Sequence, residues 1–157
     1  MRVLGIDPSY QRTGFAVVED NKLIYSFSLT LKEIKTKKKK REIIKNVIKT
    51  IELIYQPDKI VVERTRLFSR GVISMKTIVA LGSLIVVIVD ATDLDVYSVD
   101  SRSFKAKVVG HANCSKQDVI NWVKFIFKID VNEDEADAVA IALYPFIKNP
   151  LLRRENN

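Results

Sequence analysis

The sequence predicts an α/β fold built on a five-stranded mixed sheet, three antiparallel strands plus two parallel ones, flanked by helices. Three strand patterns follow one another directly in the first 31 residues, as in an antiparallel meander. Two further short strands then alternate with helical patterns, which is typical of parallel strands joined by crossover helices. The chain has 157 residues, 47% of them hydrophobic, so a single domain of this size can bury its own core.

The first two strands form a predicted hairpin. Residues 3–6 are mostly apolar and lead to Asp7, and Pro8 stops the strand because proline has no backbone N–H to donate. Thr13 and Gly14 open the returning strand, which runs to Val18. An acid at the carboxyl end of a buried strand is a candidate for chemistry. An Asx-type cap of the turn is an equally good interpretation of Asp7 on this evidence alone.

The third strand and the first helix complete the amino-terminal half. Residues 22–31 alternate apolar and polar side chains with period two, as in a half-buried strand. Glu33 to Tyr55 shows the three-four spacing of a helix facing a sheet. The start of this helix carries like charges that oppose one another, and we interpret it as a solvated basic face. Its cations are Lys35, Lys37, Lys38, Lys39, Lys40 and Arg41.

The fourth strand, residues 59–63, is almost continuously apolar, which is expected of a strand covered on both faces, and it ends at Glu63. A basic loop with one aromatic residue follows, and an apolar helix is predicted from Val72 to Asp90. The apolar run within this helix is too short to cross a membrane. The loop contains Arg64, Arg66, Phe68 and Arg70.

The carboxyl-terminal part is predicted to hold a fifth strand and three helices. The strand covers residues 95–99, and Asp100 or Ser101 caps a short helix that Gly110 ends. Ser115 caps the next helix. The last helix begins at Asn132 or Glu133 and is expected to end near residues 149–150. We therefore expect one domain over residues 1–150 and a frayed tail over residues 151–157.

Four acids are predicted to converge at one edge of this sheet. A right-handed crossover after the meander places the fourth strand beside the first, so Asp7 and Glu63 become neighbours. Asp134 and Asp137 lie three residues apart on one helix face. The helix dipole alone could explain Asp134, which is in the first turn, whereas Asp137 lies between alanines on a face that turns inward.

This set of acids favours a metal-dependent nuclease. Carboxylates are the ligands that Mg²⁺ or Mn²⁺ prefers, and two such ions together can promote phosphodiester cleavage. The formal net charge of +7 favours a polyanionic partner. Cys114 is the single cysteine, which fits a reducing compartment, and the amino terminus lacks the pattern of a signal peptide. We expect a cytoplasmic protein that spans no membrane.

Four blocks of the chain resemble the RuvC-type Holliday junction resolvases of the RNase H-like superfamily. They occur in the order and spacing of that family and span nearly the whole chain. The short, divergent chain also suggests a phage-encoded member, acting in a bacterial cell or a phage-infected host. The blocks are residues 4–8 with Thr13-Gly14, residues 60–63, residues 104–110 and residues 134–142.

The resemblance implies a catalytic site, a substrate and an assembly. Asp7, Glu63, Asp134 and Asp137 match the family's metal-binding catalytic acids, implying two Mg²⁺ ions, with Mn²⁺ as a substitute. A homodimer would place two such sites on opposing strands of a four-way junction or other branched DNA, in recombination and repair. The apolar helix from Val72 is the candidate dimer contact, with a purely structural core role as the alternative. The expected DNA-binding residues are Arg64, Arg66, Phe68, Arg70, Lys105, Lys107 and Lys116.

Two other functions are compatible with the sequence. An RNase H-like ribonuclease acting on RNA/DNA hybrids would use the same kind of acids. A non-cleaving junction-binding protein would need a broken metal site. Arg66 stands where the family has a phenylalanine, with Phe68 as the nearest aromatic residue, and the residues identify no branch-migration partner.

Overall fold

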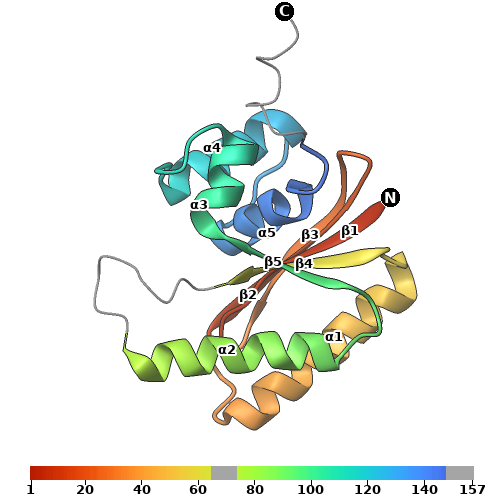
Figure 1. The fold of residues 1–157 in the computed structure, drawn as a ribbon, viewed down its shortest axis with the longest axis vertical. Coiled ribbons are helices and arrows are strands. Elements are labelled where there is room, and N and C mark those ends of the chain that lie inside the picture. The colour runs from red at the N-terminus through yellow and green to blue at the C-terminus, as the bar shows by residue number, and fades with distance from the viewer. Residues whose placement is uncertain (65–73, 148–157) are drawn as a thin grey trace, which may run out of the picture.

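The structure is a computed structural model that describes residues 1–64 and 74–147. Its sheet has the strand order β3-β2-β1-β4-β5 (Figure 1). β2 is antiparallel to both of its neighbours, β1 and β3, whereas β4 and β5 are parallel to β1. The predicted five-stranded mixed sheet is therefore confirmed. The strands are β1 (Arg2–Asp7), β2 (Arg12–Glu19), β3 (Lys22–Thr30), β4 (Lys59–Arg64) and β5 (Val96–Asp100).

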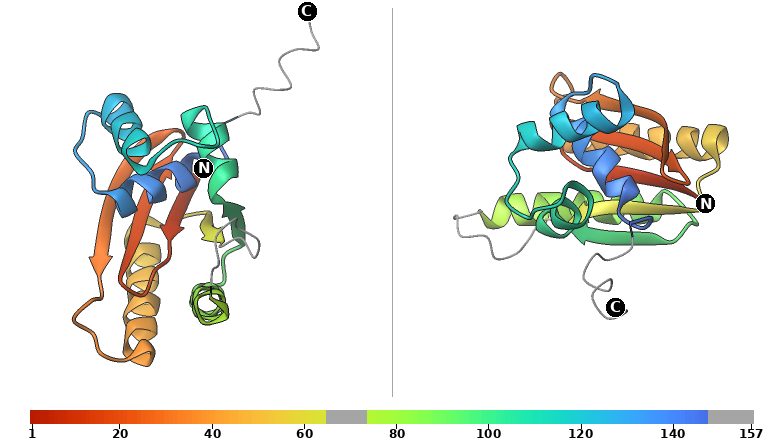
Figure 2. Two further views of the ribbon diagram at one scale, coloured as in Figure 1. Left: turned by 90° about the vertical axis from the view of Figure 1, so that its left-hand side faces the viewer. Right: turned by 90° about the horizontal axis from the view of Figure 1, so that it is seen from above.

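Helices cover both faces of the sheet. One face carries α1 (Lys37–Tyr55) and α2 (Met75–Asp90), and the other carries the remaining helices (Figures 1 and 2). Those on the second face are α3 (Ser101–Phe104), the π-helical turn η1 (Lys105–Val109), α4 (Lys116–Phe127) and α5 (Glu133–Leu143). In the described part of the chain, no helix has the length and apolar character needed to cross a membrane.

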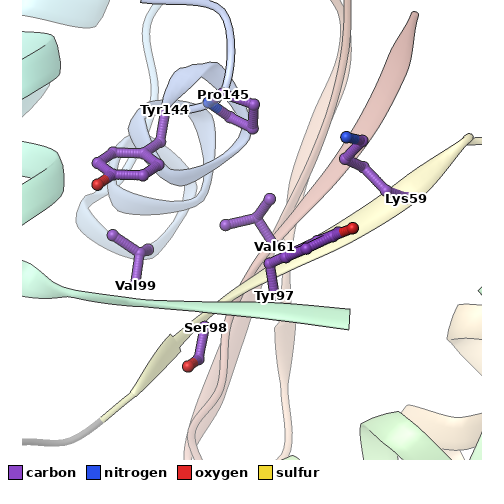
Figure 3. A pocket seen from close by; sticks show the side chains of 7 residues that line it. All are labelled: Lys59, Val61, Tyr97, Ser98, Val99, Tyr144 and Pro145. Carbon is purple, nitrogen blue, oxygen red and sulfur yellow. The ribbon is translucent and has the colours of Figure 1, made fainter. Parts of the chain in front are cut away.

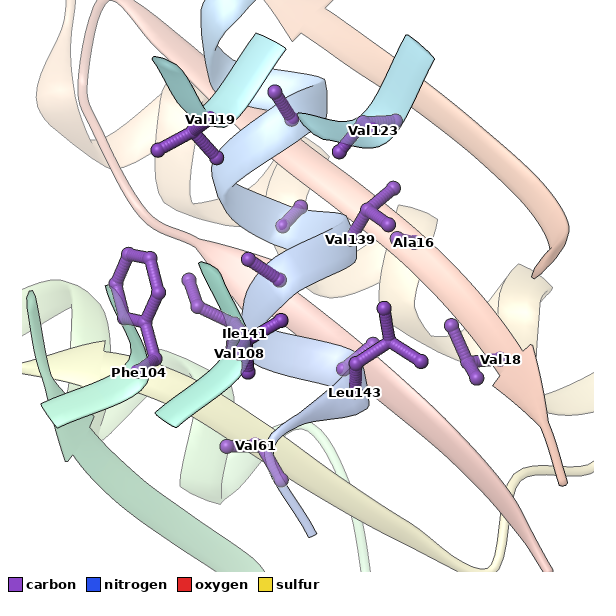
Figure 4. Close-up of a cluster of buried hydrophobic side chains, with 14 of the residues drawn as sticks. Ala16, Val18, Val61, Phe104, Val108, Val119, Val123, Val139, Ile141 and Leu143 are labelled. Carbon is purple, nitrogen blue, oxygen red and sulfur yellow. The ribbon is translucent and has the colours of Figure 1, made fainter. Parts of the chain in front are cut away.

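Two hydrophobic cores follow from the alternation of side chains along the strands. Leu4 and Ile6 of β1 pack with α1 and α2, whereas Val3 belongs to the core under α5. Figure 4 shows that second core, with Val139 and Ile141 of α5 among neighbouring buried side chains. Because β1 and β4 are covered on both faces, their central residues are fully buried.

Helix α5 lies unusually close to the sheet. A Cβ atom added to Gly5 would lie 2.3 Å from the carbonyl oxygen of Ala138, and one added to Gly14 would lie 1.9 Å from that of Asp134. Neither position has room for a side chain. The glycines of β1 and β2 therefore allow the α5 backbone to rest directly on the strands, facing small side chains such as Ala142. The small alanines of α5 permit this close approach from the side of the helix, and the two glycines permit it from the side of the sheet.

The predicted boundaries of two helices are wrong. α1 begins at Lys37 rather than Glu33, because Thr36 caps it, its side chain accepting a hydrogen bond from the Lys39 N–H at 3.3 Å. α5 ends at Leu143 rather than near residue 149, because Pro145 cannot donate the next helical hydrogen bond. Smaller differences concern β3, which ends at Thr30, β5, which starts at Val96, and α2, which starts at Met75 after a Ser74 cap.

Candidate active site

Three acids from three elements meet at one edge of the sheet. Asp7 ends β1, Glu63 lies near the end of β4, and Asp137 projects from α5. One carboxylate oxygen from each of them lies within 4.8 Å of the other two. The register explains the first pair, since Ile6 is opposite Val62 and the next residues of these parallel strands are the two acids. The predicted convergence of these three acids agrees with the structure.

The turn after Asp7 is fixed by Thr13, which is fully buried. Its hydroxyl donates a hydrogen bond to the Ser9 carbonyl oxygen at 2.8 Å and accepts one from the Ser9 N–H at 3.3 Å. The chain therefore leaves the sheet directly after Asp7 in a defined path. Asp137 is fixed from the opposite direction, because α5 lies directly on Gly5 and Gly14.

Burial, together with neighbouring negative charges, raises the pKa values of all three acids. For Asp7, burial is the main cause of a pKa well above the ordinary value, followed by the negative charges of Glu63 and Asp137. Burial, and then the charge of Asp137, raises the pKa of Glu63 to about 7. Burial also raises the pKa of Asp137 to about 6, although Lys105 acts in the opposite direction. Three buried carboxylates this close together need protons or cations to neutralise them.

The side chains present fit a divalent cation. Asp137 is only 9% exposed, and its buried Oδ1 atom has no hydrogen-bond partner among the described residues. A buried carboxylate oxygen without a donor is costly unless another positive group neutralises it. Carboxylate oxygens are the ligands that Mg²⁺ and Mn²⁺ prefer. The unpartnered oxygen and its two acidic neighbours therefore have the chemistry of a metal site.

Asp134 lies beside the cluster of three acids but outside it. Its side chain is 21% exposed and its Oδ2 atom is 3.3 Å from Nη1 of Arg12. Its negative charge contributes to the raised pKa values of Asp7 and Asp137, so it is near both. The role of Asp134 as a fourth metal ligand stays a prediction. Arg12 is not among the residues predicted from the sequence, because its contact with Asp134 joins positions 122 residues apart in the chain.

The predicted DNA-binding residues lie in different surroundings. The positive charge of Lys105 acts on Glu63 and Asp137, and Lys116 forms an ion pair with Glu133 at the start of α5. Lys107 instead lies with its Nζ atom 4.2 Å from the centre of the Tyr144 ring. The exposed Arg64 ends β4. Arg66, Phe68 and Arg70 lie outside the described residues.

Two cavities help to locate the chemistry. One of about 270 Å³ opens beside Asp7 and Glu63, and Leu81 and Ile85 of α2 line its far side. Another of about 170 Å³ lies between β4, β5 and the end of α5 (Figure 3). Its lining contains no carboxylate and consists of Lys59, Val61, Tyr97, Ser98, Val99, Tyr144 and Pro145. The first cavity is therefore the one that belongs to the acidic site.

Comparisons with known proteins identify the family to which the chain is similar. The family described as "Crossover junction endodeoxyribonuclease RuvC" matches residues 3–144. The protein of that name from Rickettsia prowazekii is 33% identical over 152 residues, which cover 90% of this chain and 94% of the relative.

Two solved structures share the fold. One is Thermus thermophilus RuvC in complex with Holliday junction substrate, with a TM-score of 0.73, 23% identity and coverage of 95% of this chain and 99% of that chain. The other is the yeast mitochondrial Holliday junction resolvase, with a TM-score of 0.58, 16% identity and coverage of 89% of this chain and 75% of that chain.

Proposed function

The chain belongs to the RuvC family of crossover junction endodeoxyribonucleases, and from this premise we propose that it resolves Holliday junctions by paired cleavage of phosphodiester bonds. The observation that carries the proposal is the group of three carboxylates within 4.8 Å of one another. The resemblance of the four sequence blocks to this family is confirmed. The positive net charge of the chain supports a polyanionic substrate.

We propose that Asp7, Glu63 and Asp137 hold Mg²⁺ ions, with Asp134 as a fourth ligand and Mn²⁺ as a substitute. Two ions, when bound there, would supply the positive charge that favours deprotonation of the attacking water and stabilises the leaving oxygen. The unpartnered Oδ1 of Asp137 supports its role as a ligand. The register of β1 and β4 holds Asp7 and Glu63 side by side at the strand ends, which supports their role as shared ligands.

Basic side chains near the acids would position the DNA backbone. Lys105 and Lys116 both lie close enough to affect the electrostatic potential at Asp137, which supports a phosphate contact for each. Contacts of this kind bind phosphates without reading the sequence of bases. We propose the same role for Arg64, Arg66, Arg70 and Lys107, and a stacking contact with an unpaired base for Phe68.

We also infer that the protein is a homodimer in which α2 pairs with α2 of the partner. Leu84 and Ile88 face the core, whereas Met75, Val79, Val86 and Val89 are 71%, 63%, 57% and 48% exposed. With Gly82, these exposed residues recur at alternating intervals of four and three, which is the spacing of a helix-pairing seam. A twofold dimer would present two active sites to a junction that itself has twofold symmetry.

A cleavage assay with Mg²⁺ on end-labelled substrates tests the proposed function. The panel contains a mobile four-way junction, a three-way fork, plain duplex DNA and an RNA/DNA hybrid, and Glu63→Gln is the control. We expect symmetric paired nicks in the junction that are lost in the variant. Preferred cleavage of the hybrid would favour a ribonuclease, and tight junction binding without any cleavage would favour an architectural protein.

A further inference from the structure

The start of α1 concentrates positive charge that remains unneutralised within the described chain. The ion pairs found among the described residues do not involve the exposed lysines of this segment. The first turn of α1 contains no acidic residue. The segment, which we call the α1 lysine cluster, consists of Lys35, Lys37, Lys38 and Lys39, all of them exposed.

This arrangement opposes the local stability of the helix. Cations are unfavourable at a helix amino terminus, where the backbone N–H groups already carry partial positive charge. Within α1, Lys37 and Arg41 are four residues apart, so like charges also repel one another along the helix surface. Local features that disfavour the fold are expected where function requires them. A bound anion would remove both penalties.

The cluster lies at the same edge of the sheet as the acids. Thr30, the last residue of β3, is opposite Arg12 in the register, and the Leu31 N–H donates to the Gln11 carbonyl oxygen at 2.8 Å. β3 is therefore parallel to β1, and it ends beside Gln11, the last residue of the turn that follows Asp7. α1 starts from this edge and runs back beneath the sheet (Figures 1 and 2).

Tyr10 connects the cluster directly to the turn that follows Asp7. The Nζ atom of Lys40 donates to the Tyr10 carbonyl oxygen at 2.8 Å, and Nζ of Lys37 lies 5.3 Å from the centre of the Tyr10 ring. The Tyr10 hydroxyl in turn is 2.7 Å from the Ser83 hydroxyl of α2. These contacts fix the start of α1 relative to the acidic site.

The acids consequently lie between two groups of cations. Lys105 and Lys116 belong to the helices on one face of the sheet, whereas the α1 lysine cluster belongs to the other face. Duplex DNA carries about one negative charge per 1.7 Å of its axis, so an arm that crosses the edge would meet positive charge on both sides of the acids.

We propose that Lys35, Lys38 and Lys39 form a second phosphate-binding surface, which holds an arm of branched DNA on the opposite side of the acids from Lys105 and Lys116. This inference rests on the proposed function, because it assigns a further contact to the same substrate. The contact is sequence-independent, since exposed lysines bind phosphates as point charges.

Two double variants test the proposal on a Glu63→Gln background, which is intended to separate binding from cleavage. Lys38→Ala with Lys39→Ala removes two charges from the α1 lysine cluster. The control, Lys22→Ala with Lys49→Ala, removes two charges outside the α1 lysine cluster. Both lysines are exposed: Lys22 begins β3, at the edge of the sheet opposite the acids, and Lys49 lies farther along α1. Binding to a four-way junction is measured by fluorescence anisotropy in Mg²⁺ over a range of salt concentrations, and circular dichroism verifies folding.

We expect the cluster variant to raise Kd roughly tenfold at low salt and to flatten the slope of log affinity against log salt by about one to two. The Lys22 and Lys49 control should keep the Kd and slope of its parent. Equal Kd values and slopes for the two double variants would overturn the proposal. A wild-type protein that binds DNA but never cleaves it would overturn the proposed function alone. The two double variants could still be compared for binding, and that comparison would still test the phosphate-binding surface. Failure of the parent to bind nucleic acid would overturn both.

Discussion

Asp137 and its neighbours show how the surroundings of a residue decide its chemistry. Glu133, Asp134 and Glu135 all lie in the first turn of α5, where the helix dipole favours acids. Asp137 comes one turn later, is buried and has an oxygen without a partner. The sequence distinguished Asp137 from Glu133 and Glu135 through its flanking alanines. The ion pair of Asp134 with Arg12 could not be predicted, because it depends on a contact between distant parts of the chain.

Glu63→Gln should lower the rate of junction cleavage by at least about 100-fold while leaving the protein folded and able to bind DNA. The substitution keeps the shape of the side chain but removes a negative charge from the cluster of three acids. Single-turnover cleavage and a binding titration measure the two effects. Glu33→Gln, at an exposed position before α1, is the matched control and should cleave like the wild type. An active Glu63→Gln protein would exclude Glu63 from the chemistry.

The metal-free protein should lose stability as the pH rises from 5 to 8. The pKa values of Glu63 and Asp137 in the fold, about 7 and about 6, lie above their ordinary values, so the folded state holds protons that the unfolded state releases. Their contribution is complete below the ordinary pKa values and is lost as the pH passes through about 6 to 7, at a cost on the order of a few kcal/mol.

Urea unfolding in EDTA at several pH values measures this loss. Glu63→Gln should flatten the pH dependence and be more stable than the wild type at pH 8. The same pH dependence in both proteins would contradict the assignment of raised pKa values to this cluster.

At the scale of elements, the order of strands and helices was predictable and two helix ends were not. Strand ends at Asp7 and Glu63 followed from apolar runs, a following proline and the crossover rule. Apolar residues continue beyond Pro145, at Phe146 and Ile147, so the pattern alone places the end of α5 too late, although proline cannot donate the next helical hydrogen bond. The contact of Gly5 and Gly14 with α5 joins segments more than a hundred residues apart, which no local pattern reveals.

Gly14→Ala should displace α5 and with it Asp137. The new Cβ would lie 1.9 Å from the Asp134 carbonyl oxygen, a backbone atom that cannot move without shifting the helix. We expect a loss of roughly 2 kcal/mol or more in the free energy of unfolding and a strong loss of cleavage. Chemical denaturation and the junction assay measure these effects.

Asn46→Ala is the control, because Asn46 is exposed within α1 and lies in neither the acidic site nor the proposed dimer contact. This variant should keep the free energy of unfolding of the wild type or raise it by up to about 1 kcal/mol, because alanine has a higher helix propensity. If Gly14→Ala is as stable and active as this control, the close packing of α5 does not fix the site.

The whole molecule has an apolar helix face that a single chain leaves uncovered. The sequence identified α2 as apolar but left open whether it serves as core or as contact. The structure shows a buried side with Leu84 and Ile88 and an exposed side with Val79 and Val86. The assembly itself could not be derived from the residues, because a strongly apolar helix can equally be buried in the core of a single chain.

Replacing both Val79 and Val86 by Glu should convert the proposed dimer to a monomer and abolish paired cleavage. Across a twofold axis each introduced glutamate would lie near its copy in the partner, and the like charges would repel one another. Because Val79 and Val86 are exposed in the single chain, the substitutions leave its core intact. Light scattering coupled to size-exclusion chromatography measures the mass. Leu53→Glu, at a position of α1 that is 80% exposed, should leave the mass unchanged. A dimeric double variant would place the contact elsewhere.

Binding of Mn²⁺, followed through the paramagnetic resonance signal of the free ion, tests most directly whether the three acids form a metal centre. Wild type, Asp137→Asn and Asp130→Asn are compared at pH 8, above the pKa values of about 7 for Glu63 and about 6 for Asp137. Asp130 has an 87% exposed side chain and provides a matched loss of one charge. The wild type and Asp130→Asn should bind up to two ions per chain, and Asp137→Asn should bind at least about tenfold more weakly. Equal binding by all three proteins, or no binding by the wild type, would contradict a metal centre built on Asp7, Glu63 and Asp137.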